Sequence, residues 1–193
     1  MRQNRMNPRV TAFGLLFAGL AATAGVRPPA SARTPSPAAT AASTPAPPSC
    51  STPEYRQFDF WLGDWDMTGA DGKPAGHNKI AGIVNGCALQ ENWTSVKGGR
   101  ATSVSIYDAA SRRWHQTWVD DSGGLLLLEG EFRDGKMVLV GRRPSQKSKG
   151  TMIIHRITWT SLDPDRVHQL WEASGNEGRT WTTVIEGTLI RKK

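Results

Sequence analysis

The sequence lacks the residue patterns that identify the commonest enzyme classes. Its 193 residues contain no G-x-S-x-G nucleophile turn, no phosphate-binding glycine loop and no H-E-x-x-H zinc motif. These absences argue against the usual hydrolase, nucleotide-binding and zinc-protease sites. The four histidines have no metal-ligand spacing to acidic residues or cysteines, so we expect no bound metal.

Long apolar runs are also lacking. The longest, residues 12–26, is shorter than the roughly 20 residues that span a membrane, and it contains three glycines. It follows a basic segment and precedes residues 30–32 (ASA), an order typical of a secretory signal with its cleavage site. We therefore expect residues 1–32 to be a cleaved signal peptide, with residues 22–24 (ATA) as an alternative site. The mature protein would be periplasmic or secreted and would keep no stable membrane anchor.

Cysteine is scarce, at two residues, and there is no Cys-x-x-Cys spacing that would suggest thiol-redox chemistry. An even pair in an exported protein is typical of a structural disulfide. We predict a bridge between Cys50 and Cys87, which would contribute about 4 kcal/mol in the chain-entropy model.

A strong excess of basic charge is absent once the signal is set aside. The formal net charge is +7, and residues 1–32 hold four arginines and no acid, which leaves +3 for the remaining chain. The only local basic excess, Arg142, Arg143, Lys147 and Lys149, lies in a stretch with Pro, Ser and Gly that is typical of a solvated loop. We expect no nucleic-acid partner, because such a partner requires a strongly basic face.

Residues 33–49 are rich in Pro, Ala and Thr without large apolar side chains, which predicts an extended linker. Residues 50–193 have the length of one domain. One short helix is expected over residues 53–62, before Gly63. Frequent turn signals then separate short alternating runs rich in Val, Ile, Thr and Trp, which predict strands. These runs are residues 64–69, 76–84, 87–95, 101–107, 112–119, 124–132, 136–141, 151–160, 166–173 and 179–191.

A regular series of antiparallel strands must bury one face of each strand and avoid exposed edges. Closing into an up-and-down barrel does both. The sequence therefore predicts an all-β, antiparallel up-and-down barrel of about ten strands with one short N-terminal helix. A two-sheet sandwich is the main alternative.

The string FDFWLGDWD at residues 58–66, followed by QENW, HQTW and QLWE, resembles a family of exported bacterial proteins of unknown function. The resemblance covers residues 50–193 and implies no particular activity. Within the string, Gly63 and Trp65 also resemble the G-x-W signature that opens the first strand of lipocalins and related calycin barrels. In those barrels a basic residue from the last strand packs on the tryptophan, and Arg191 is in that place. This resemblance implies structural roles for the three residues and a barrel that binds small molecules.

A short segment occurs twice. HQTW at residues 115–118 recurs as HQLW at residues 168–171, and each is followed after a turn by Glu-Gly, at residues 129–130 and 186–187. One interpretation is a pair of glutamines presented to one ligand. The other is a pair of similar hairpins that occupy equivalent positions and need similar packing.

Alternate residues of a strand share a face, which allows the interior to be assigned. The face that carries Trp and Gln is the better interior. Its members are Glu91, Trp93, Trp114, Gln116, Trp118, His155, Trp159, Gln169, Trp171 and Trp181. Aromatic walls with a few polar groups are typical of a ligand pocket, so we expect a small apolar or aromatic ligand in the lumen and no required cofactor. A filled core whose polar groups satisfy one another is the alternative.

Two further hypotheses use the same residues. Glu91, with a pKa raised by burial, and a neighbouring His155 could act as base and acid on a carbonyl or ester. His155 is also the only histidine expected in the interior, so a haem group would take it as its axial ligand. A third hypothesis, a module that binds partner proteins through its outer face, predicts a filled lumen.

Overall fold

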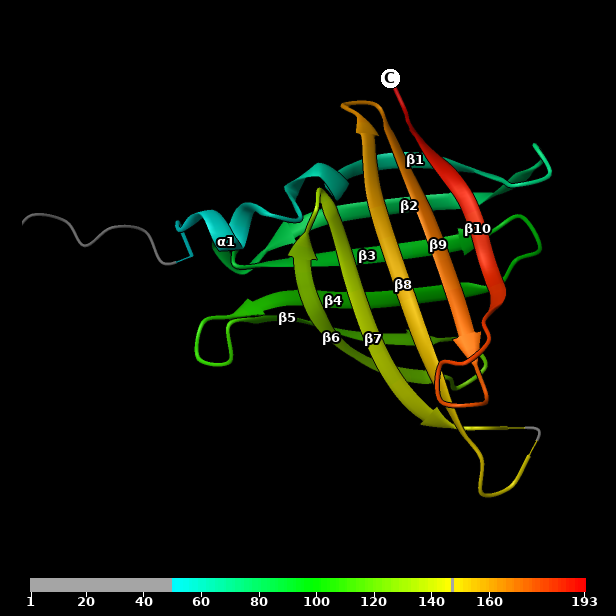
Figure 1. The fold of residues 1–193 in the computed structure, drawn as a ribbon. Coiled ribbons are helices and arrows are strands. Elements are labelled where there is room, and N and C mark those ends of the chain that lie inside the picture. Colours follow the sequence, from blue (N-terminus) through cyan, green and yellow to red (C-terminus); the bar gives the residue numbers. More distant parts are fainter. Residues whose placement is uncertain (1–49, 147) are drawn as a thin grey trace, which may run out of the picture. The chain divides into compact units, whose positions relative to one another are not determined.

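The chain forms a closed barrel of ten antiparallel strands (Figure 1). The computed structural model describes residues 50–146 and 148–193, so the predicted signal peptide and linker lie outside the described residues. The prediction of an all-β, ten-stranded barrel after a short helical segment is confirmed, and a two-sheet sandwich is excluded.

Each strand pairs with the next one along the chain, as expected of an up-and-down barrel. The last strand also pairs with the first, with Arg191 opposite Trp65, and this pairing leaves no free sheet edge. In Figure 1 the later strands cross over the earlier ones of the opposite wall. The strands are β1 (Gly63–Gly69), β2 (Pro74–Ile83), β3 (Ala88–Ser95), β4 (Arg100–Asp108), β5 (Arg113–Asp120), β6 (Leu125–Arg133), β7 (Lys136–Pro144), β8 (Met152–Asp163), β9 (Arg166–Ser174) and β10 (Thr182–Arg191).

The helical segment before β1 consists of two short pieces, α1 (Pro53–Arg56) and η1 (Asp59–Trp61), instead of the single helix predicted. The break lies at Phe58, whose backbone leaves the helical region (φ −105°, ψ 6°). The break turns Phe58 and Trp61 towards the core, where both side chains are fully buried and their rings stack with centroids 4.7 Å apart. A further short turn, η2 (Val84–Gly86), joins β2 to β3. No helix in the described part of the chain is long and apolar enough to cross a membrane.

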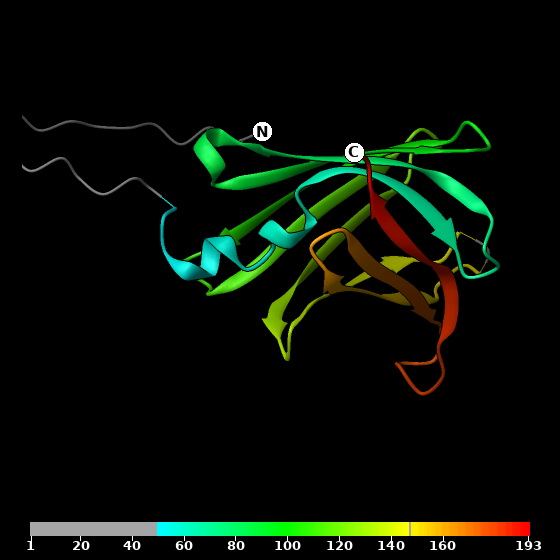
Figure 2. The same cartoon turned by 90° about the horizontal axis from the view of Figure 1, so that it is seen from above.

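The predicted disulfide is confirmed: Cys50 is bonded to Cys87. The bridge joins the start of the described chain to the residue that precedes β3. Arg56 of α1 also donates a hydrogen bond to the backbone oxygen of Gly86 in η2. These links hold the helical segment (cyan in Figure 2) at the end of the barrel where β2 ends and β3 begins.

An aromatic plug fills the barrel at the helical end, made of Phe58, Trp61, Trp65, Trp114 and Trp159, each at most 1% exposed. Phe58 contacts the rings of Trp114 and Trp159 edge-on, with centroids 5.7 and 5.2 Å away. The indole of Trp65 donates a hydrogen bond to the backbone oxygen of Trp61 (3.0 Å). The plug therefore ties the segment before β1 to the barrel interior.

Gly63 begins β1 in a conformation that only glycine adopts readily, with φ at +143°. A Cβ atom at this position would lie 2.2 Å from Nη1 of Arg191. The guanidinium of Arg191 lies 4.1 Å from the centroid of the Trp65 ring and donates a hydrogen bond to the backbone oxygen of Leu62 (3.0 Å). Gly63 thus leaves the space that Arg191 uses to reach across the end of the barrel.

Candidate functional site

A small cavity lies inside the barrel beyond the aromatic plug. Its polar lining consists of Asn78, Glu91, Gln116 and Gln169, and tryptophans form much of its wall. Its volume is about 50 Å³, which holds one or two water molecules. Pockets for drug-sized ligands are on the order of 300–1,000 Å³. The interior is therefore mostly filled by side chains, and the space that remains is lined by both polar and aromatic groups.

Glu91 is the centre of a buried hydrogen-bond network. Asn78 Nδ2 donates to its Oε1 atom (2.8 Å), and Ser103 Oγ donates to its Oε2 atom (2.7 Å). Gln116 Nε2 in turn donates to Ser103 Oγ (3.2 Å) and to Ser105 Oγ (3.0 Å). Strand register explains the cluster, because Glu91 on β3 lies directly opposite Ser103 on β4, and Ser105 lies opposite Gln116 on β5.

Burial raises the pKa of Glu91, and the hydrogen bonds from Ser103 and Asn78 act against this rise. Glu91 is 6% exposed, and its two hydrogen-bond donors are neutral groups. Among the described residues, no lysine or arginine lines the cavity. The carboxyl group therefore lies in the interior without a basic partner from the described part of the chain.

The polar lining of the cavity is incomplete. Three buried side-chain oxygens of this lining find no hydrogen-bond partner in the described part of the chain: Asn78 Oδ1, Gln116 Oε1 and Gln169 Oε1. The side-chain amide nitrogen of Asn78 donates its hydrogen bond to Glu91, and the Asn78 carbonyl oxygen is left without a partner among the described residues. The indole nitrogen of Trp159, which also lines the cavity, is an unpaired donor. Buried polar atoms ordinarily have a partner, so this cluster marks a place where one is missing.

Seven of the ten side chains that the sequence assigns to the lumen line this cavity. They are Glu91, Trp93, Gln116, Trp118, Trp159, Gln169 and Trp171. Trp114 is also in the interior, but it belongs to the aromatic plug, where its indole donates a hydrogen bond to Gln57 Oε1 (3.1 Å).

The sequence prediction omitted Asn78, Ser103 and Ser105, the three residues that complete the Glu91 network. On β4 the apolar residues are not the inward ones. Val104 and Ile106 are each 41% exposed on the outer face, whereas Ser103 and Ser105 point inward, so hydrophobicity alone indicates the wrong face of this strand. The available signal for Asn78 was its position two residues before the buried Ile80 on β2, because residues two apart in a strand share a face.

His155 is buried, as an inward histidine should be, but it does not join the Glu91 network. Trp171 Nε1 donates to His155 Nδ1 (3.0 Å), and Arg143 Nε points at His155 Nε2 (3.2 Å). Burial, and then the positive charge of Arg143, lower the pKa of His155 to about 4, so its ring is neutral at pH 7. Within the described residues, Glu91 and His155 have separate hydrogen-bond partners and share no hydrogen bond with each other.

Trp181 lies outside the lumen, which corrects its assignment as a lining residue. A bulge in β10 places Thr183 opposite Glu172 but Ile185 opposite Trp171, so the alternation of faces reverses between them. Trp181 precedes the bulge and its ring covers the guanidinium of Arg156, with the Arg156 Cζ atom 4.0 Å from the ring centroid. Counting alternate residues backwards from Ile185 therefore gives the wrong face.

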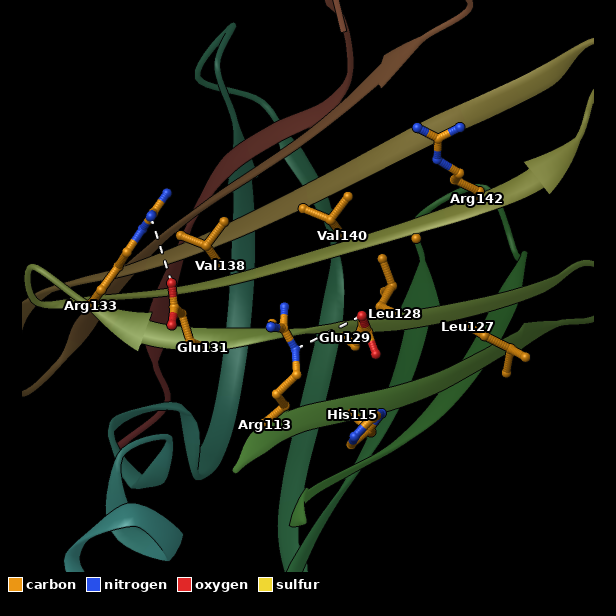
Figure 3. Close-up of a pocket in the computed structure, with 12 residues that line it drawn as sticks. Arg113, His115, Leu127, Leu128, Glu129, Glu131, Arg133, Val138, Val140 and Arg142 are labelled. Atoms are coloured by element: carbon orange, nitrogen blue, oxygen red, sulfur yellow. Dashed lines mark ion pairs between the residues drawn. The ribbon is translucent and has the colours of Figure 1, made fainter. Parts of the chain in front are cut away.

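A larger hollow, of about 640 Å³, lies on the outer face of β5, β6 and β7 (Figure 3). Its wall includes Leu127 and Val140, and its charged groups form exposed ion pairs, Arg113 with Glu129 (3.8 Å) and Arg133 with Glu131 (3.6 Å). None of the unpartnered buried polar atoms found in the described residues belongs to this hollow. Its polar groups are thus already satisfied, by one another or by solvent.

Among residues 50–146 and 148–193, no group of three or more His, Cys, Asp or Glu side chains is arranged to hold a metal ion. No protein-family model matches the sequence, and no curated protein matches it significantly.

Proposed function

We propose that this protein binds a small molecule in its barrel lumen, at the cavity between the Glu91 network and the tryptophans. The observation that carries the proposal is the incomplete polar lining, in which Asn78, Gln116 and Gln169 each keep a buried oxygen without a partner in the described chain. Leaving such groups unpaired costs about 1–3 kcal/mol each. A bound molecule that donates hydrogen bonds removes this cost.

The duplicated segment supports the same proposal. Gln116 and Gln169, from HQTW and HQLW, line the same cavity. Trp118 and Trp171, the last residues of the two segments, meet edge-on with ring centroids 5.2 Å apart. This arrangement favours the interpretation in which two glutamines are presented to one ligand. We therefore propose a ligand that makes hydrogen bonds, in place of the small apolar or aromatic molecule expected from the sequence.

Entry of a ligand larger than one or two water molecules requires a side chain to move. Trp93 and Trp118 are the partly exposed tryptophans of the lining, whereas Trp159 and Trp171 are buried. A change of rotamer at Trp93 or Trp118 would enlarge the cavity towards solvent without breaking the Glu91 network. We assign these two residues the role of a movable wall.

The setting of the protein is part of the proposal. The Cys50–Cys87 disulfide indicates an oxidising, non-cytoplasmic environment. We infer export through a signal at residues 1–32, and membership of the exported bacterial family that the FDFWLGDWD string resembles. Lipocalin-like binding of small molecules fits the closed barrel, and the ligand would then be a compound found outside the cytoplasm.

Tryptophan fluorescence tests this function. The purified protein is titrated with a panel of small molecules, and Trp118→Leu is compared with Trp181→Leu, a matched change outside the lumen. We expect saturable fluorescence changes in the wild type and in Trp181→Leu, and a loss of affinity of about tenfold or more in Trp118→Leu. Absence of any saturable response, or equal responses in both variants, would refute binding in the lumen.

The outer hollow supports a second candidate function, the binding of a partner protein. Leu127 on β6 is 58% exposed and lines this hollow together with Val140 on β7, which is 38% exposed. For this function, Leu127→Asp would abolish association with the partner, and the lumen variants would have no effect. Leu127→Asp should leave the free energy of unfolding nearly unchanged, because the side chain is on the outer face.

A further inference from the structure

We infer that the ligand is a small organic cation, with an ammonium group that lies between the acceptor oxygens of the cavity and the carboxylate of Glu91. This inference rests on the proposed function and deepens it by naming the class of ligand. It is based on the unpaired acceptors and donors of the cavity, on the lack of a basic partner for Glu91 among the described residues, and on the aromatic wall.

The first argument is the excess of acceptors. Asn78, Gln116 and Gln169 each offer a buried carbonyl oxygen without a partner in the described residues, and all three side chains are at least nine-tenths buried. Trp159 Nε1 is the single fully buried donor without a partner among the residues that line the cavity in the described chain. An ammonium group has three donors and no acceptor, so it matches this inventory better than a hydroxyl or a carboxylate does.

The second argument is charge. Glu91 is buried, its donors Asn78 and Ser103 are neutral, and no basic side chain of the described residues lines the cavity. An isolated buried carboxylate is unfavourable unless it takes a proton or gains a cation. Arg143, the basic group near this end of the interior, is directed at His155 instead. A cationic ligand supplies the missing counter-charge.

The third argument is the wall of the cavity. Trp93, Trp118 and Trp171 present indole groups around the polar side chains, and indole faces attract cations. A bare Ca²⁺ ion takes six to eight oxygen ligands, roughly twice the number that the four polar side chains present as unpaired oxygens. An ammonium group on a short carbon chain uses both the oxygens and the indoles. Its smallest members also fit the volume of about 50 Å³.

Methylammonium is the probe that tests this inference. The purified protein is titrated with methylammonium chloride, with methanol as the neutral analogue of equal size, and with potassium chloride as the inorganic cation. We expect methylammonium to bind at least about tenfold more tightly than methanol or potassium. Binding is read from tryptophan fluorescence and from titration calorimetry.

Two variants make the test specific. Glu91→Gln keeps the size of the side chain and removes its charge, and it should weaken methylammonium binding by about tenfold or more. Glu129→Gln removes an exposed carboxylate of the outer hollow and should leave the affinity for methylammonium unchanged.

If Glu91→Gln fails to fold, the pH dependence of methylammonium binding to the wild type tests the same point. Glu91 is the only ionisable side chain in the cavity lining of the described chain, and Arg143 and His155 lie beyond Trp171. Affinity should therefore rise with pH as Glu91 ionises.

The outcomes separate the two proposals. If methanol or another neutral compound binds as tightly as methylammonium, the cation inference is overturned and the binding function stands. Potassium binding of equal strength would indicate an inorganic cation site and would also overturn it. An affinity that is independent of pH and of Glu91→Gln has the same consequence. If no compound binds at all, both proposals fail.

Discussion

The guanidinium of Arg191 on β10 lies over the indole ring of Trp65 on β1, with its Cζ atom 4.1 Å from the ring centroid. The same side chain donates hydrogen bonds to the backbone oxygens of Leu62 (3.0 Å) and Pro164 (3.0 Å). Arg191 thus connects the first and last strands, the β8–β9 turn and the end of the helical segment.

Replacing Arg191 with alanine should lower the free energy of unfolding by about 2–3 kcal/mol, because a cation–π contact and two hydrogen bonds are lost. Arg191→Lys should recover only part of this loss, since an ammonium lacks the planar fork that reaches two carbonyl oxygens. Urea unfolding measures both variants, with the exposed Arg179→Ala as the control. A loss no greater than that of the control would contradict the assigned role.

Gly63→Ala should also be destabilising, by about 1–3 kcal/mol, because φ is +143° and the new Cβ would lie 2.2 Å from Arg191 Nη1. Part of this cost comes from the clash with Arg191. In an Arg191→Ala background the effect of Gly63→Ala should therefore be smaller. A double-mutant cycle measured by urea unfolding checks this, and strictly additive effects would show that the two residues are independent.

The barrel was predictable from the sequence because its local signals agree. Turn residues separate the strands, and the inward Trp and Gln positions of β5 and β9 alternate regularly. The prediction failed where local pattern and tertiary packing differ. The bulge in β10 reversed the face of Trp181, and β7 continues to Pro144, so Arg142 and Arg143 lie on a strand and not in a loop.

The free volume of the lumen could not be predicted from the alternation of inward and outward residues along the strands. Which residues face inward follows from the strand period, but the free volume depends on how the plug fills the barrel. Phe58 and Trp61 enter the interior from the helical segment, where strand alternation gives no information. The Glu91 network likewise depends on register between strands, because Ser103 and Asn78 come from two neighbours of β3.

Removing the disulfide should lower the free energy of unfolding by about 4 kcal/mol, since the bridge spans a sequence separation of 37 residues. The double variant Cys50→Ser, Cys87→Ser, compared with the wild type in urea, measures this difference. Reduction of the wild type should have a similar effect. A midpoint that is unchanged by the double substitution would show that the α1–η2 contacts alone hold the segment.

His155 should make the protein less stable in mild acid. Its pKa is about 4 in the folded protein, below the ordinary value of 6.5, so the unfolded chain binds a proton first as the pH falls. The contribution of the neutral ring is complete above pH 6.5 and decreases as the pH falls towards 4. His155→Gln should therefore show a flatter dependence of unfolding free energy on pH in this window. Parallel curves for the two proteins would contradict the prediction.

The most direct test of ligand binding is native mass spectrometry of the protein purified from its own exported fraction. The wild type and Trp181→Leu should carry a stoichiometric small molecule, and Trp118→Leu, purified in parallel, should carry less or none. Bare chain masses for all three proteins, whatever the purification conditions, would contradict the proposal that the lumen is a binding site.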